Sequence, residues 1–297
     1  MQSVLQEFNI KLQLEKEESL VKTQKGLLSS FWSENATTLV KDFTYHKLTH
    51  SKGVLKKILT IVKNVDLELS SDDYFILAMS ALLHDIGMSI DILIHDDIQQ
   101  CAIKNYHATH EPSKLIAADP NFQKYIRDNH NALSAAYCDL KLDISLDILS
   151  KEQKQAIIDC CLYHRNLNES FFTVEAINKL TKNQLLVALF RMGDELDIGT
   201  ERISQGEQTA FNRPAESESY WELNKREKIT ISASNDVKLN IYVNNEDSNR
   251  HNINKLMNGV ISDFNKKNGG LFAILCRLGV RISFNVFDSG VETVDRL

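Results

Sequence analysis

Glycine and proline are scarce in this chain, and that scarcity limits the folds open to it more than any other feature. Its 297 residues include only 11 glycines and 3 prolines. Both residue types interrupt regular backbone and supply the turns that a β sandwich of many short strands requires. We therefore predict a mainly α protein built from long helices.

Apolar residues recur with helical spacing from the N-terminus to about residue 215. One such stripe contains Val54, Ile58 and Val62, each four residues after the last. N-capping patterns at Ser70 and Ser150 predict where two helices begin. Together these patterns predict an all-helical domain over residues 1–215, with helices over residues 4–28, 47–65, 71–87, 121–137, 151–164 and 181–197. Residues 89–120 are less regular.

Beyond residue 215 the pattern changes to β-branched and alternating residues. Residues 228–233 and 237–243 predict a hairpin, because two strand-like runs flank a short polar turn. Residues 248–278 are typical of a helix, and residues 280–287 of a final strand. We predict a small C-terminal α+β subdomain over residues 216–297, in the order strand, strand, helix, strand.

Composition and charge exclude several classes of protein. Hydrophobic residues make up 43% of the chain and charged residues 25%, as in globular rather than disordered proteins. The net charge of −6 and the lack of a basic patch do not indicate nucleic-acid binding. The sequence holds no long apolar run for a membrane helix, no secretory signal and no disulfide framework among its five cysteines. We expect a cytoplasmic protein with reduced thiols and no membrane association.

The strongest functional pattern is an adjacent His84 and Asp85 that we place in the last turn of an apolar helix, in the segment LLHDIG. A buried aspartate is rare unless it is paired or bound to a metal. His50 lies on the inward stripe of an earlier helix, and Asp194 lies near the end of a later one. Two imidazoles and two carboxylates on helices form a mixed nitrogen and oxygen set that suits a divalent cation.

The order of these residues resembles the H…HD…D pattern of the HD superfamily of metal-dependent phosphohydrolases. The resemblance covers roughly residues 40–205. It implies an all-helical HD core in which His50, His84, Asp85 and Asp194 bind a first metal. The alternative from the residues alone is a pair of buried histidines that cap helices beside satisfied acids.

Some members of this superfamily add histidines that bind a second metal, with the HD aspartate bridging the two. His130 and His164 are the candidates here, and the element from Arg127 through His130 to Ser134 resembles HD domains of the HD-CE type. His110 is a rival for the role of His130. His130 and His164 could instead be core or surface side chains beside a mononuclear site. The GYP signature of the related cyclic-di-GMP phosphodiesterases is missing, so that specificity is not carried over.

The resemblance implies a hydrolase that cleaves a phosphoester or phosphodiester bond of a nucleotide-like substrate through a metal-activated water. One or two ions of Mn, Mg, Fe, Co or Zn fit such ligands. We expect Asp85 and Arg191 to act in catalysis, with Arg127 and Arg165 binding substrate. A phosphorylated small molecule is the expected partner, and an oligonucleotide substrate stays open.

Two alternatives compete with the enzyme. One is a non-catalytic HD domain that senses a nucleotide, and the other is an interaction module of a signalling or defence complex. HD proteins commonly self-associate, so a homodimer is compatible with the resemblance, although no residue points to it.

Overall fold

The computed structural model is mainly helical, as predicted. It describes residues 1–29, 48–89, 95–109, 120–142, 149–165 and 181–197, residue 262, and four strands nearer the C-terminus. The helices of this part are α1 (Gln2–Glu7), α2 (Leu14–Ser29), α3 (Leu48–Asn64), α4 (Ser71–Leu83), α6 (Asp96–Tyr106), α7 (Pro120–Lys141), α8 (Lys151–Tyr163) and α10 (Lys182–Glu195). A 3-10 turn, η2 (Ile86–Met88), follows α4.

Helix α4 is the most buried of the described helices. Every residue from Phe75 to Leu83 is buried, so the helix is enclosed on all sides as a core helix must be. Its start is fixed by a capping box, in which Ser70 accepts from the Asp73 amide and the Asp73 carboxylate accepts from the Ser70 amide. The predicted N-cap is therefore confirmed, and it sets the point at which the chain enters the core.

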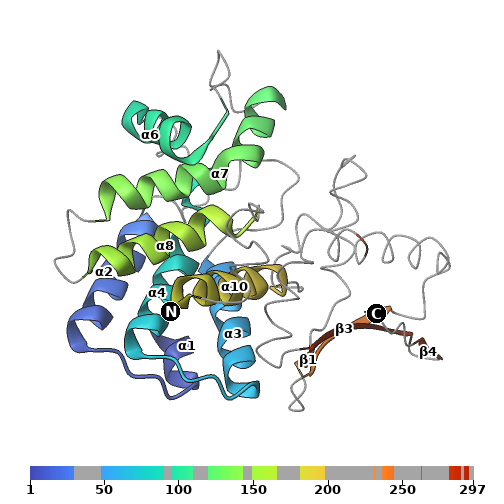
Figure 1. Ribbon diagram of the computed structural model, residues 1–297. Helices are drawn as coiled ribbons and strands as arrows, with labels where there is room; N and C mark the ends of the chain where they lie inside the picture. The colour runs from blue at the N-terminus through green and yellow to red at the C-terminus, as the bar shows by residue number, and fades with distance from the viewer. Residues whose placement is uncertain are drawn as a thin grey trace.

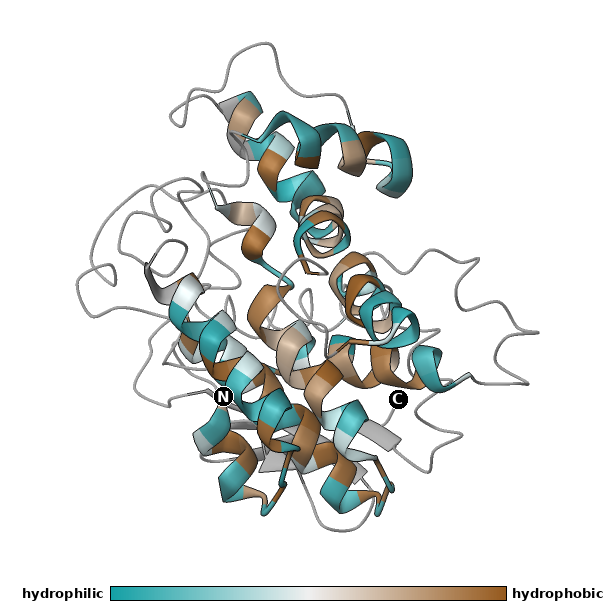
Figure 2. Ribbon diagram, turned by 90° about the vertical axis from the view of Figure 1, so that its left-hand side faces the viewer, coloured by the Kyte–Doolittle hydropathy of each residue, from teal (hydrophilic) through white to brown (hydrophobic). Residues whose placement is uncertain are grey.

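Helices α2, α3, α8 and α10 contact α4, while α6 contacts α7, so segments far apart in the sequence come together (Figure 1). Helix α10 contacts α3 and α8, while α8 also contacts α4 and α7. The turn η2 packs against α7. Figure 2 shows apolar residues gathered where the helices face one another and hydrophilic residues on their outer sides. The start of α3, the ends of α4, α8 and α10, and the middle of α7 supply the site described below.

The structure corrects two sequence predictions of helix boundaries and adds one helix where none was predicted. Residues 4–28 do not form one helix, because α1 and α2 are separated by a turn in which Asn9 has a φ of 58°. Helix α4 ends at Leu83 rather than at Gly87, so His84 is its C-cap and Asp85 begins η2. The segment 89–120, which lacks a clear period, contains α6. Its polar composition hides the helix, since few apolar residues mark the inner face.

Four strands form one sheet in the order β1-β2-β3-β4. Strands β1 (Thr230–Ile231) and β2 (Asp236–Val243) pair antiparallel, β2 and β3 (Arg281–Asp288) pair parallel, and β3 and β4 (Val291–Thr293) pair antiparallel. A parallel pair requires a crossover connection. The predicted helix over residues 248–278 would supply it, but that segment, apart from residue 262, and the predicted boundary at residue 215 lie outside the described residues.

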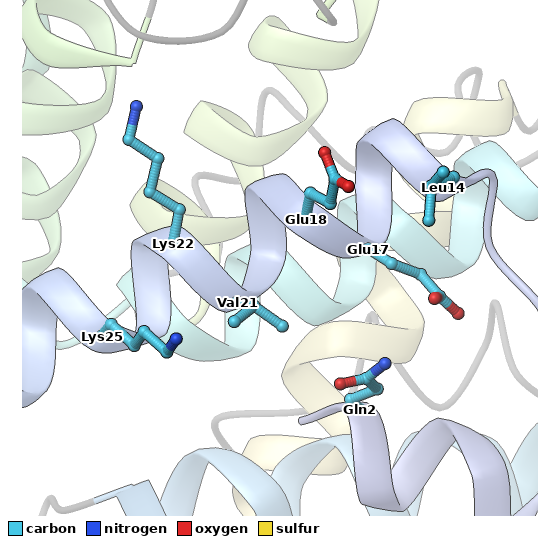
Figure 3. A pocket seen from close by; sticks show the side chains of 7 residues that line it. All are labelled: Gln2, Leu14, Glu17, Glu18, Val21, Lys22 and Lys25. Atoms are coloured by element: carbon cyan, nitrogen blue, oxygen red, sulfur yellow. The ribbon is translucent and has the colours of Figure 1, made fainter.

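A surface pocket lies along α2, at the start of α1 (Figure 3). Leu14, whose exposed fraction is 70%, and Val21 are its apolar members. The remaining lining residues are polar or charged: Gln2, Glu17, Glu18, Lys22 and Lys25. None of them belongs to the elements that hold the candidate site, so this pocket is a separate feature. Among the described helices, none is both long and apolar enough to cross a bilayer.

Candidate metal centre

The site begins where α4 ends. His84 has helical backbone angles at the C-cap, and Asp85 leaves the helix with φ −103° and ψ 5°. Both side chains are buried, with exposed fractions of 1% and 2%. The change from α-helix to η2 therefore places adjacent imidazole and carboxylate groups inside the protein, where each needs a polar or charged partner.

A first group of ligand atoms forms around His50, His84 and Asp85. The Nε2 atoms of the two histidines are 3.1 Å apart. Asp85 Oδ2 lies 2.9 Å from His84 Nε2 and 3.5 Å from His50 Nε2. Ligands held about 2.0–2.2 Å from one cation lie roughly 3 Å from each other, so these donors fit a single metal ion.

Asp194 Oδ1 borders the same group. It lies 3.2 Å from His50 Nε2 and 3.7 Å from His84 Nε2. The structure thus brings together all four residues of the H…HD…D pattern, although 144 positions separate the first from the last in the printed numbering (194 − 50). Helix α10 makes this possible because it packs against α3.

A second group consists of Asp85, His130 and His164. The Nε2 atoms of the two histidines are 3.2 Å apart, and each lies 3.7 Å from Asp85 Oδ1. Asp85 therefore directs Oδ2 toward the first group and Oδ1 toward the second. Two histidines and a shared carboxylate also suit a divalent cation. His110, the rival of His130, lies outside the described residues.

Hydrogen bonds on the outer ring nitrogen orient three of these histidines. The Nδ1 atom of His84 is 3.2 Å from the Ala81 carbonyl, and those of His130 and His164 lie 3.0 Å and 2.6 Å from the carbonyls of Arg127 and Cys161. A carbonyl oxygen only accepts, so Nδ1 must carry the proton. In the neutral ring Nε2 then has a lone pair for a metal, and each ring obtains this orientation from the carbonyl three residues before it.

Burial and charge set the protonation states. Burial and, to a smaller extent, the nearby His84 together lower the pKa of His164 to about 4, so the ring is neutral at pH 7. Burial alone would raise the pKa of Asp194, but its contact with His50 and the neighbouring rings of His84 and His164 bring it below its usual value. At neutral pH the site therefore offers a neutral imidazole and an ionised carboxylate, the forms that bind cations.

The three predicted arginines lie in different surroundings. Arg165 is partly exposed, and its Nη1 lies 3.4 Å from His130 Nδ1, beside the second group. Arg127 is also partly exposed, on the same turn as His130. Arg191 is buried, with an exposed fraction of 1%, and donates to the Tyr163 carbonyl at the end of α8. Its guanidinium thus contacts the residue before His164.

One residue of the site has no assigned role in the sequence analysis. Asp197 Oδ2 lies 2.6 Å from His50 Nδ1, on the side of the ring away from the other ligands. The available signal is its spacing, because it follows Asp194 by three positions at the end of α10. Spacing alone does not show which of two such carboxylates faces Nε2 and which faces Nδ1.

Comparison with known proteins agrees with this geometry. The family model HD-CE matches residues 40–263, which is well over half of the chain and includes every residue of both groups. No curated protein and no solved structure gives a match. The matched span and the clustered histidine and aspartate residues lead to one conclusion: this chain belongs to the HD-CE family.

Proposed function

We propose that this protein is a metal-dependent phosphohydrolase that cleaves a phosphoester or phosphodiester bond of a nucleotide-like substrate. The observation that carries the proposal is the position of Asp85, which lies between two histidine pairs with one oxygen toward each. A shared carboxylate of this kind is typical of sites that hold two cations side by side. Such cations, when bound, lower the pKa of water and offset charge on phosphoryl oxygens.

The donor set supports two cation positions. His50, His84, Asp85 and Asp194 would hold one, and Asp85, His130 and His164 would hold the other. Because four of the ligands are imidazoles, the site favours Mn, Fe, Co or Zn over metals that prefer oxygen ligands alone. The carboxylates also allow Mg to bind. Because the imidazoles of His84, His130 and His164 are already oriented by backbone carbonyls, little reorganisation is needed to bind the ions.

The arginines divide into two roles under this proposal. Arg165 and Arg127, both partly exposed beside His130, would bind substrate phosphate, since guanidinium groups pair well with phosphoryl oxygens. Arg191 was expected to act in catalysis. Its contacts with the Tyr163 carbonyl and, at 3.7 Å, with Glu195 favour a role in holding the end of α8, and with it His164. Substitution of Arg191 should then alter metal content before it alters substrate affinity.

The proposal is tested by metal content and hydrolysis in the same preparations. We expect about two metal ions per chain in protein purified without chelator, and cleavage of bis(p-nitrophenyl) phosphate or p-nitrophenyl phosphate with Mn²⁺. Asp85→Ala should lose both, because it removes the carboxylate that the two groups share. Asp159→Asn changes a buried carboxylate of α8 that hydrogen-bonds Gln155 and Asn183, and it should lose neither.

Three outcomes would change the proposal. One ion per chain, retained in His130→Ala, would reduce the site to the first group. Full metal content with no hydrolysis of either probe or of a nucleotide panel would replace the enzyme with a metal-containing sensor. No ion in the wild-type protein after incubation with Mn²⁺ or Fe²⁺ would reject a metal-dependent function.

A further inference from the structure

His50 differs from the other three histidines in the group that holds its outer nitrogen. His84, His130 and His164 each donate to a neutral backbone carbonyl. His50 Nδ1 instead contacts the Asp197 carboxylate at 2.6 Å. A hydrogen bond to an ionised acceptor is roughly twice as strong as a neutral one, and it makes the opposite nitrogen a better electron donor.

Two carboxylates from one turn of chain bracket the His50 ring. Asp194 Oδ1 is 3.2 Å from Nε2, and Asp197 Oδ2 is 2.6 Å from Nδ1. The amide of Asp197 also donates to the Asp194 carbonyl at 3.1 Å, so the backbone holds the two residues in a fixed relation. The ring is buried, with an exposed fraction of 1%, and Asp197 is exposed by only 5%. Solvent therefore does little to weaken this contact.

Helix α3, which carries His50, leaves space for the Asp197 carboxylate. Gly53 lies one turn after His50 on α3, and a Cβ atom there would overlap Asp197 Oδ1. The clash would be with the carboxylate itself, because its Oδ1, Cγ and Oδ2 are the nearest atoms. Any side chain at position 53 would have to displace the group that contacts His50. Gly53 and Asp197 thus form a matched pair, 144 positions apart (197 − 53).

We propose that Asp197 is a positioning residue that holds His50 with Nε2 toward the first ligand group, and that Gly53 provides the space it occupies. The effect on metal affinity rests on the proposed function, because it requires His50 to be a ligand. The effect on the His50 ring does not, since the contact exists in the protein alone.

Zinc affinity provides the first test. Chelator competition with Zn²⁺ should show about 10-fold weaker binding in Asp197→Asn, which keeps an acceptor but loses the charge, and up to about 100-fold weaker binding in Asp197→Ala. Gly53→Ala should weaken Zn²⁺ binding as much as Asp197→Ala does, although it removes no carboxylate. Gly26→Ala and Asp159→Asn are the matched controls for the two kinds of substitution, and both should bind Zn²⁺ as the wild type does.

Nitrogen-15 NMR of the imidazoles provides the second test, with the His50 signal assigned through His50→Gln. The wild type should show His50 protonated at Nδ1, both with Zn²⁺ and, without metal, at a pH where the ring is neutral. Asp197→Ala and Gly53→Ala should lose this preference, which a purely structural role would leave intact. Unchanged Zn²⁺ affinity and an unchanged His50 signal in both variants would overturn the proposal. If the wild type binds no Zn²⁺, the proposed function fails, and the metal-free spectra still decide the role of Asp197.

Discussion

At the scale of single residues, buried carboxylates of this protein have opposite pKa shifts, and their partners explain the difference. Burial raises the pKa of any carboxyl group. Asp73 overcomes this because it pairs with Lys182 at 2.7 Å and accepts hydrogen bonds from Ser70, so its pKa is lowered. Asp159 accepts hydrogen bonds from the side-chain amides of Gln155 and Asn183, which are neutral, and burial keeps its pKa raised.

This difference predicts that Asp159→Asn stabilises the protein at neutral pH. The folded-state pKa lies above the usual value of 3.8, so ionised Asp159 reduces the free energy of unfolding, and the loss grows as pH rises through the folded pKa. The amide variant removes this cost. It should have a higher Tm at pH 7, and its advantage should disappear as pH falls below 3.8, where the acid becomes neutral in both states. Thermal unfolding of both proteins across this range measures it, and a constant Tm difference at all pH values would contradict the explanation.

At the scale of elements, the contact of η2 with α7 determines how the two histidine pairs share Asp85. The Gly87 amide donates to Ser134 Oγ at 2.9 Å, and Ser134 is fully buried. A Cβ atom on Gly87 would overlap the His130 carbonyl and approach Leu133 and the Ser134 amide. The turn that carries Asp85 thus lies directly against the backbone of the helix that carries His130. Two of the three neighbouring atoms are main chain and the third is Leu133 Cβ, so none of them can rotate away.

Two glycine substitutions should therefore have effects of opposite sign. Gly87→Ala should lower the free energy of unfolding by about 1–3 kcal/mol, because α7 must move to admit the methyl group. Gly26→Ala should raise it by about 0.4–1 kcal/mol, because nothing lies within 4 Å of its Cβ and α2 gains a better helix former. Urea unfolding in the presence of chelator separates both effects from metal binding. Equal effects of the two variants would show that the η2–α7 contact is not tight.

At the scale of the whole molecule, the candidate ligands come from α3, the end of α4, α7, the end of α8 and α10. These elements form the described helical core together with α6 and the N-terminal helices. A cation held by His50, His84 and Asp194 would connect α3, α4 and α10, and one held by His130 and His164 would connect α7 and α8. Metal binding and folding should therefore be coupled.

We expect removal of metal to lower the Tm by several degrees. Free metal at 100 times its Kd stabilises the folded state by about 2.7 kcal/mol if the unfolded chain does not bind it. Differential scanning calorimetry with EDTA and then with excess Mn²⁺ should show the loss and its recovery. In Asp85→Ala the two scans should coincide. A Tm that is indifferent to metal in the wild type would indicate that the clustered side chains do not hold an ion.

Several elements could be predicted from sequence because their signals are local. The capping boxes at Ser70 and Ser150 depend on side chains three residues apart, and the inward stripe of α3 on a spacing of three or four. The prediction of a single helix over residues 4–28 was wrong because polar composition there left no apolar stripe to follow. The family match over residues 40–263 confirms the resemblance, while the individual metal and substrate roles stay predictions.

The sequence by itself determined that the chain is mainly helical and that an HD pair lies near the end of an apolar helix, since both depend on neighbouring residues. Only the tertiary structure decided which atoms face each other: the two oxygens of Asp85 toward different histidine pairs, Asp197 rather than Asp194 on His50 Nδ1, and Arg191 beneath the end of α8. These contacts join residues up to 147 positions apart. Their geometry depends on how whole helices pack, and helix packing is set by side-chain shape across the interface, which no local pattern encodes.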